Sequence, residues 1–241
     1  MVSSERERIR RSASSHYADG GPIWLPDDAW NDAKRLKIDA FCRAHFAAVV
    51  SADAIVLNAG AGSTNYEWIP PQTIGLDRFH RQIAGTENGV VGDVEMLPFR
   101  DSVFDVVVCV GSVLNYVSAI EALSELCRVL RLGGFLFLHF ESSDSLEHIG
   151  SGRWRSDVAL LPTINNGRPD VVWIYSRRFI LRSLQQLGFR LADWEGFHVA
   201  SAALLRLGAS QGVAARAHRV DRWLGPLQRF GDDVILLAEK G

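Results

Sequence analysis

The residues best suited to ligand binding lie at positions 55–63, where a short apolar run is followed directly by glycines. The apolar run at 55–57 predicts a buried strand. Glycines after it let the backbone approach a ligand more closely than a β-carbon would allow. The pattern suits several ligands and also a purely structural turn, so it predicts a binding loop without selecting its ligand. The polar and small residues of this loop are Asn58, Gly60, Ala61 and Gly62.

A carboxylate, Asp77, closes the next predicted strand at residues 73–77 and is followed by Arg78. An acidic side chain at this position can accept hydrogen bonds from both hydroxyls of a ribose. It fits a nicotinamide dinucleotide as well as other adenosine ligands. Such a residue can also act only as a helix cap or turn former, and this alternative stays open for Asp77.

The third block begins with Gly92, Asp93 and Val94, continues through the LPF sequence at 97–99, and ends with a nearly continuous apolar run at 104–110. A helical segment ending in the sequence RVLRLGG at 128–134 follows. In this order the blocks resemble the class I S-adenosylmethionine-dependent methyltransferases, and the resemblance runs from about residue 55 to 140. A nicotinamide enzyme would have no reason to carry the middle block, and Asn65 stands where the third glycine of its fingerprint should be.

The resemblance implies S-adenosyl-L-methionine as methyl donor and gives roles to individual residues. Asn58 replaces the acidic residue that helps the family anchor the methionine amine, so it keeps hydrogen bonding and loses charge attraction. The remaining implied contacts are Gly60, Ala61 and Gly62 along the methionine part, Asp77 on the ribose, Arg78 and Val94 beside the adenine, Asp93 on its amino group, and Gly111 with Ser112 facing the sulfonium.

Methyl transfer needs orientation and exclusion of water more than it needs a base. If the acceptor atom is a hydroxyl, a base would help, and His139 or Glu141 at the end of the fifth predicted strand would be suitably placed. His139 could equally be a structural, half-buried histidine. Tyr116, after the fourth strand, is a candidate acceptor contact, and Tyr17 in the N-terminal segment is a candidate cation-π wall for the sulfonium.

The elements that must position these residues alternate between strands and helices. Such alternation implies right-handed crossovers and a parallel sheet whose ligands bind beyond the carboxyl ends of the strands. We expect an α/β fold, a Rossmann-like doubly wound sheet of seven strands that is mostly parallel, with an antiparallel last strand and an inserted hairpin. Short strands are predicted at 54–58, 73–77, 89–91, 104–110 and 135–140. Ser118 and Glu121 are predicted to form a capping box, and Gly133-Gly134 to end the helix that follows.

The chain is expected to form a single methyltransferase domain over residues 1–241. Its parts are a mobile N-terminal arm (1–26), a leading helix (27–50) capped at Asp27 or Asp28, a donor-binding half (51–140), an inserted hairpin at the acceptor region (141–177), and C-terminal helices and strands (178–241).

Composition limits the partners. A net charge of −2 gives no overall basic field for a phosphate backbone, so nucleic acid is disfavoured and a small-molecule acceptor is expected. The cysteines Cys42, Cys109 and Cys127 lack CxxC spacing, which predicts free buried thiols, no metal site and a cytoplasmic protein. No signal peptide or membrane span is expected. Two alternatives stay open, namely an inactive methyltransferase-like binding module and, because the C-terminal stretch is basic, an RNA methyltransferase.

Overall fold

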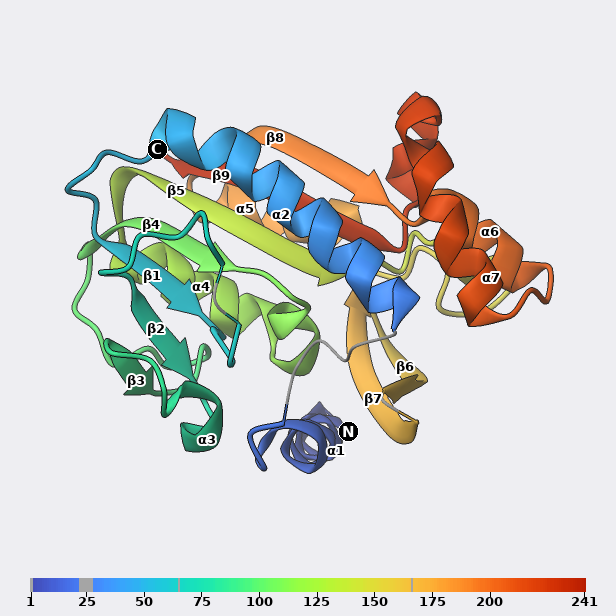
Figure 1. The fold of residues 1–241 in the computed structure, drawn as a ribbon, viewed down its shortest axis with the longest axis horizontal. Helices are drawn as coiled ribbons and strands as arrows, with labels where there is room; N and C mark the ends of the chain where they lie inside the picture. The colour runs from blue at the N-terminus through green and yellow to red at the C-terminus, as the bar shows by residue number, and fades with distance from the viewer. Residues whose placement is uncertain (1, 22–27, 65, 166) are drawn as a thin grey trace.

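The computed structural model describes residues 2–21, 28–64, 66–165 and 167–241, so the predicted cap Asp27 and the departure at Asn65 lie outside the described residues. Within the described residues, seven strands form one sheet and two more form a separate hairpin (Figure 1). The strands are β1 (Val56–Ala59), β2 (Ile74–Asp77), β3 (Gly89–Val91), β4 (Phe104–Cys109), β5 (Leu130–Glu141), β6 (Val158–Asn165), β7 (Arg168–Tyr175), β8 (Phe189–Phe197) and β9 (Asp233–Lys240).

The large sheet has the strand order β3-β2-β1-β4-β5-β9-β8. The pairs among β1 to β5 are parallel, with Leu57 of β1 opposite Ile74 of β2 and Val107 of β4. β9 enters between β5 and β8 and runs antiparallel to both. The predicted Rossmann-like sheet with an antiparallel last strand is therefore confirmed.

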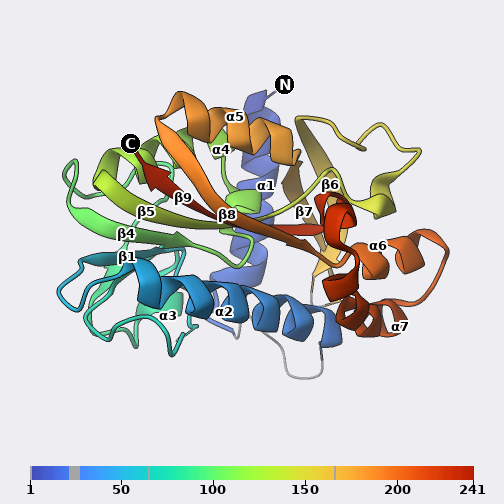
Figure 2. The ribbon, with the colours of Figure 1, turned by 90° about the horizontal axis from the view of Figure 1, so that it is seen from above.

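Helices cover both faces of this sheet, with α2 on one face and α4 and α5 on the other (Figure 2). Alternate residues of β4 divide between two apolar cores, because successive strand side chains point to opposite faces. Val106 and Val108 pack in the core that contains Ile38 of α2, whereas Val107 packs in the core that contains Leu123 of α4. The helices are α1 (Val2–Tyr17), α2 (Ala29–Val49), α3 (His80–Ile83), α4 (Ala119–Val129), α5 (Arg177–Gln186), α6 (Val199–Arg206) and α7 (Gln211–Ala215).

The N-terminal segment differs from the loose arm that was predicted, because the structure has a 16-residue helix, α1, there. Its Ile9 and Ala13 are buried, with 1% and 5% of their surfaces exposed. α1 lies beyond the carboxyl ends of β1 and β2 and beside β7 (Figure 1). The helix thus covers the edge of the sheet at which ligands of this fold class bind.

The predicted capping box of Ser118 and Glu121 is wrong. Ser118 does precede α4, but its side chain makes no cap hydrogen bond. Instead, Arg6 of α1 donates to Ser118 Oγ at 3.0 Å and to Glu121 Oε1 at 2.7 Å. The backbone N–H of Ser118 donates to Glu95 Oε1 at 2.6 Å. Arg6, which is distant in the sequence, therefore binds both side chains of the predicted capping box.

Two other predicted helix ends were the cap of α2 at Asp28 and the stop at Gly133-Gly134. Asp28 caps α2 as predicted, accepting from the backbone N–H of Trp30 and Asn31 at 3.1 Å each. Gly133 and Gly134 do not separate helix from strand, because β5 already begins at Leu130, across a register shift in its pairing with β4. An irregular strand start accommodates glycines without ending the pairing.

The inserted hairpin forms as predicted from the antiparallel strands β6 and β7. The basic segment after residue 210 consists of α7 and two short 3₁₀ helices, Arg216–Trp223 and Gly225–Phe230. Cys42, Cys109 and Cys127 are buried and free, as expected. In the parts of the chain that the structure describes, no helix combines the length and apolar character needed to cross a membrane.

Candidate functional site

The site is built from the loops that leave the carboxyl ends of β1, β2 and β4. Gly60 follows β1 with a φ of +78°, and a β-carbon there would clash with the side chain of Val113. Gly111 and Ser112 follow β4 with φ values of +80° and +64°. Left-handed backbone at a non-glycine residue is uncommon and concentrates at functional sites. The tight turns after β1 and β4 thus face each other across a space that side chains leave open.

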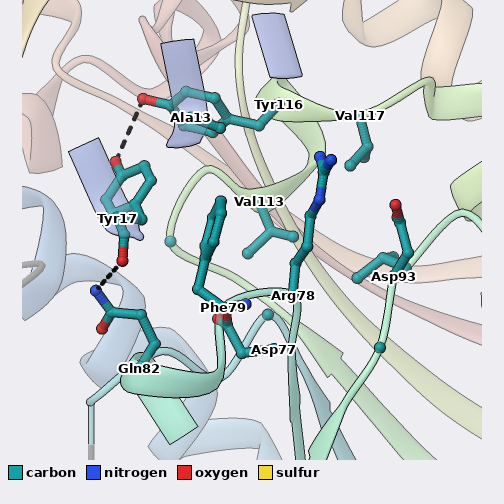
Figure 3. A pocket seen from close by; sticks show the side chains of 14 residues that line it. Ala13, Tyr17, Asp77, Arg78, Phe79, Gln82, Asp93, Val113, Tyr116 and Val117 are labelled. Carbon is teal, nitrogen blue, oxygen red and sulfur yellow. Dashed lines mark hydrogen bonds between the residues drawn. The ribbon is translucent and has the colours of Figure 1, made fainter. Parts of the chain in front are cut away.

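A small cavity of about 110 Å³ lies between these loops and α1 (Figure 3). Figure 3 shows the rings of Tyr17 and Phe79 pointing into the same space from opposite sides of it. The lining residues come from the ends of β1, β2, β3 and β4 and from helical segments, and are Ala13, Tyr17, Gly60, Asp77, Arg78, Phe79, Gln82, Gly92, Asp93, Val94, Gly111, Val113, Tyr116 and Val117.

The carboxylate of Asp77 is held by the backbone at the mouth of β2. Its Oδ2 accepts from the N–H of Gly62 at 2.9 Å and its Oδ1 accepts from the N–H of Phe79 at 2.8 Å. Burial raises the pKa of Asp77, and these two N–H donors oppose that rise. A carboxylate has about four lone-pair positions, so it keeps capacity to accept from a ligand's hydroxyl groups.

Helix α1 closes the small cavity through polar contacts. Arg10 pairs with Glu95 and, at 3.5 Å, with Asp93. Tyr17 donates to Tyr116 Oη at 3.3 Å, and Gln82 donates to the backbone carbonyl of Tyr17 at 3.1 Å. Ligand cavities commonly measure roughly 300–1,000 Å³, so this cavity is small for a nucleoside-sized ligand while α1 is seated.

A larger cavity of about 750 Å³ adjoins the small one, and Tyr17, Gly111 and Tyr116 line both. Tyr116 donates to Asp170 Oδ2 at 2.6 Å. Burial raises the pKa of Tyr17 and raises that of Tyr116 well above its usual range, so both phenols keep their protons at neutral pH. Besides the three shared residues, the larger cavity is lined by Asp28, Ala29, Trp30, Asn31, Lys34, Ser112, Glu141, Glu147, Leu161, Pro162, Thr163, Ile164, Asn165, Gly167, Asp170, Val172, Leu205, Gln211, Gly212 and Asp232.

A buried ammonium group, Lys34, stands at the wall of the larger cavity. Its Nζ lies 2.7 Å from Glu141 Oε1 and 3.0 Å from Asp233 Oδ1. Burial opposes the charge of Lys34, but the carboxylates of Asp233 and Glu141 outweigh it and raise the lysine pKa. Glu141 also accepts from Ser112 Oγ at 2.9 Å. Lys34 of α2, Glu141 of β5 and Ser112 in the loop after β4 are therefore linked by an ion pair and a hydrogen bond.

The geometry does not favour the base role predicted for His139. The ring is fully buried, its Nδ1 accepts from the N–H of Ser112 at 3.0 Å, and its Nε2 lies 3.1 Å from Asp233 Oδ1. Nδ1 must therefore be the unprotonated nitrogen, and Nε2–H donates to the carboxylate. Burial lowers the pKa of His139. With both ring nitrogens occupied and no exposure to either cavity, His139 positions the loop at Ser112.

The structure brings most of the predicted site residues together. Gly60, Asp77, Arg78, Asp93, Val94, Gly111 and Tyr17 line the small cavity, Ser112 and Glu141 line the larger one, and Tyr116 lines both. Asn58, Ala61, Gly62 and His139 line neither. Asn58 is buried within β1, and Gly62 contributes through its N–H to Asp77.

Several lining residues were missed by the sequence analysis. Phe79 and Val113 directly follow predicted site residues, so the order along the chain could have indicated them. Lys34 lies four residues from both Trp30 and Ile38, which are buried, and a charge in the middle of such a stripe is a signal of a buried partner. Ala13 gave no signal, because its segment has too few apolar residues to predict a packed helix.

Comparison with known families gives a match over about a third of the chain. Residues 57–138 match the family model described as a methyltransferase domain. These residues run from β1 through most of β5 and contain the loops that line the small cavity. No curated protein matches the chain in sequence.

Solved structures resemble the chain in fold. The cyclase SpnF is 20% identical, with 99% of this chain and 94% of that chain covered and a TM-score of 0.55. An S-adenosylmethionine-dependent methyltransferase from Mesorhizobium loti is 14% identical, with 86% and 98% covered and a TM-score of 0.56. The 1,6-didemethyltoxoflavin-N1-methyltransferase of Burkholderia thailandensis, solved with its acceptor and S-adenosylhomocysteine, is 16% identical, with 99% and 89% covered and a TM-score of 0.56.

Proposed function

Because the chain carries a class I S-adenosylmethionine-dependent methyltransferase domain, we propose that it transfers the methyl group to an oxygen or nitrogen atom of a small-molecule acceptor. The observation that carries this proposal is the junction of two cavities at Tyr17, Gly111 and Tyr116. One cavity is lined by residues to which we assign donor binding, and the adjoining one has the volume of a small-molecule site.

The residues of the small cavity fit the donor. The left-handed turn at Gly60 lines the small cavity, and the missing β-carbon lets the side chain of Val113 pack against this turn. Asp77 would accept from the ribose hydroxyls, with Arg78 and Val94 beside the adenine and Asp93 on its amino group. Asn58, Ala61 and Gly62 would support the methionine end from behind the loop, and Tyr17 and Ser112 would lie near the sulfur.

When bound, S-adenosylmethionine supplies a methyl group on positively charged sulfur, and the C–S bond breaks with its electron pair left on sulfur. The protein's part is to hold the acceptor atom in line with that bond and to exclude water. Tyr17, Tyr116 and the seated α1 would exclude water from the junction. Tyr116 would not act as a base, since its raised pKa keeps the phenol protonated and its hydrogen is donated to Asp170.

Glu141 is the proposed proton acceptor when the acceptor atom carries a proton. It lines the larger cavity and hydrogen-bonds to Ser112, which directly follows Gly111 at the junction. Lys34 would orient the Glu141 carboxylate through the 2.7 Å ion pair. A cytoplasmic location belongs to this proposal too, supported by the three free buried thiols.

The first experiment measures donor binding. S-adenosylhomocysteine at 100 times its dissociation constant should stabilise the protein by about 2.7 kcal/mol, which raises the melting temperature by about 5–10 °C for a chain of this size. NADH serves as the control and should give no shift. A melting temperature unmoved by millimolar S-adenosylhomocysteine would refute donor binding.

The second experiment measures transfer. Donor labelled with tritium in the methyl group is incubated with the protein and separate pools of amines, phenols, alcohols and total RNA. The proposal expects label in a small-molecule pool and none in RNA. Donor binding without label in any pool would favour the non-catalytic alternative, which the departure at Asn58 motivates.

A further inference from the structure

The wall of the larger cavity has an apolar part and an acidic part. One part is apolar and comes from the β6–β7 hairpin, with Leu161, Pro162, Ile164 and Val172. Another part is rich in carboxyl groups and comes from three different segments, with Glu141 at the end of β5, Glu147 in the 3₁₀ helix Leu146–His148, and Asp232 before β9. An occupant that matches both parts has an apolar body and a polar end.

The only ammonium group on this wall, among the described residues, is already matched by carboxylates. Lys34 Nζ contacts both Glu141 and Asp233. Asp233 is fully buried and also contacts His139 and His198, at 3.1 Å and 2.7 Å. Lys34 is therefore paired mainly with these two carboxylates, and its attraction to Asp232 is weaker.

Glu147 and Asp232 are left without partners. Neither side chain has a hydrogen bond or an ion pair within the described part of the chain, although both line the cavity. Burial raises the pKa of Glu147 and raises that of Asp232 well above its usual range, and neighbouring carboxylates add to both shifts. Burying a carboxyl group without a partner costs free energy, so the pair is poised to gain from a donor or a positive charge.

We propose that the acceptor carries a protonated nitrogen, separate from the methylated atom, that Glu147 and Asp232 bind. The proposal rests on the proposed function, which places methyl transfer at the junction. Glu147 and Asp232 line the larger cavity and not the small one, so the group they bind lies away from the junction. The apolar hairpin wall would hold the body of the acceptor between these two points.

Other occupants fit these residues less well. An anionic acceptor would face carboxyl groups whose only cation is already paired. Among the residues that the structure describes, no group of three or more His, Cys, Asp or Glu side chains could hold a metal ion. A neutral alcohol could donate one hydrogen bond, but a protonated nitrogen would bind a carboxylate more strongly, because a charge-assisted hydrogen bond is stronger than a neutral one.

The test compares two probes of nearly the same shape, 3-phenylpropylamine and 3-phenylpropan-1-ol. Binding of each is measured by calorimetry to protein saturated with S-adenosylhomocysteine, with EDTA present. The wild type should bind the amine about tenfold more tightly than the alcohol, the ratio expected from one charge-assisted contact. The double variant Glu147→Gln/Asp232→Asn should bind the two probes with nearly equal affinity.

A matched control is Glu67→Gln, which removes one carboxylate from the exposed surface, where Glu67 pairs with Arg43 at 3.4 Å. It should keep the wild-type preference. Equal affinity of the wild type for both probes, or a preference that survives in the double variant, would overturn this inference while leaving the proposed function intact. Failure of S-adenosylhomocysteine to bind the wild type would instead overturn the proposed function.

Discussion

Asp77 is shared between the protein's own backbone and the small cavity, and this double use decides how it should be tested. Its carboxylate accepts from Gly62 and Phe79, so removal of the whole group would also release the loop after β1. Asp77→Asn keeps one oxygen for the backbone and removes the charge. We expect it to weaken S-adenosylhomocysteine binding by about 1.5–3 kcal/mol, the range for a hydrogen bond to a charged group. Isothermal titration calorimetry measures this directly.

The control for Asp77 is Asp53→Asn, because Asp53 is exposed and far from the cavity lining. It should leave affinity unchanged. Asp77→Ala should bind more weakly than Asp77→Asn, because two backbone N–H groups then lose their acceptor. Wild-type affinity in a folded Asp77→Asn variant would contradict the ribose role.

His139 makes a prediction about pH. Burial lowers its pKa in the folded protein below the ordinary value of 6.5, so the unfolded chain binds the proton first as the pH falls. The stability from neutral His139 is complete above pH 6.5 and is lost as the pH falls toward the folded pKa, by up to about 1.4 kcal/mol per pH unit. His139→Asn cannot titrate, so its stability should fall less between pH 7.5 and 5.5. Urea unfolding at both pH values tests this.

The exposed residue His80 supplies the comparison, since its ring is at the surface. His80→Asn should follow the wild-type pH dependence. If His139→Asn lost as much stability on acidification as the wild type does, His139 could not be the neutral, buried donor to Asp233 that the structure describes.

At the scale of elements, the strands of the donor half were predictable because each is a short apolar run bounded by turn residues. Asp77 and Gly111 were predictable with them, since both follow strands at the ligand edge of the sheet. α1 was not, because only Ile9 and Ala13 give its buried face and the rest of the helix is polar. Its place is fixed by contacts with residues distant in sequence, such as Arg6 with Glu121, which no local pattern contains.

Those polar contacts hold α1 over the small cavity, so weakening them tests whether α1 limits the entry of a ligand. Arg10→Ala removes the pairs with Asp93 and Glu95, which are partly exposed and worth about 0.2–1 kcal/mol each. A less firmly seated helix should let S-adenosylhomocysteine enter and leave faster. We expect both the association and dissociation rates to rise, by about two- to thirtyfold, as about 0.4–2 kcal/mol for the two pairs together implies. Stopped-flow tryptophan fluorescence measures both rates.

Arg11→Ala is the matched control, because Arg11 contacts only Glu7 of the same helix, at 4.0 Å. Its rates should equal those of the wild type. Unchanged rates in Arg10→Ala would mean that α1 does not limit access to the cavity.

At the scale of the whole molecule, one buried network joins parts of the fold that the sequence keeps far apart. Lys34 of α2 contacts Glu141 of β5 and Asp233 of β9, and Asp233 contacts His198 at the start of α6. β5, the wall of the larger cavity and the C-terminal segment thus share one set of charges. The residue types were readable from the sequence, but their pairing depends on the complete sheet order.

Lys34→Met tests this network, since methionine keeps most of the side-chain volume and removes the charge. Asp233 would remain buried with only its two histidine partners, and loss of one partner from a buried ion pair costs about 3 kcal/mol. We expect a fall of about 6–12 °C in melting temperature.

Adding Asp233→Asn should recover part of that loss, so the double variant is less destabilised than the sum of the single variants. Lys37 lies in the same helix as Lys34 and forms a partly exposed ion pair with Glu195 of β8. Lys37→Met, which breaks this pair, should cost about 1 kcal/mol or less. Strict additivity in the double variant would show that Lys34 and Asp233 act independently, contrary to the 3.0 Å contact between them.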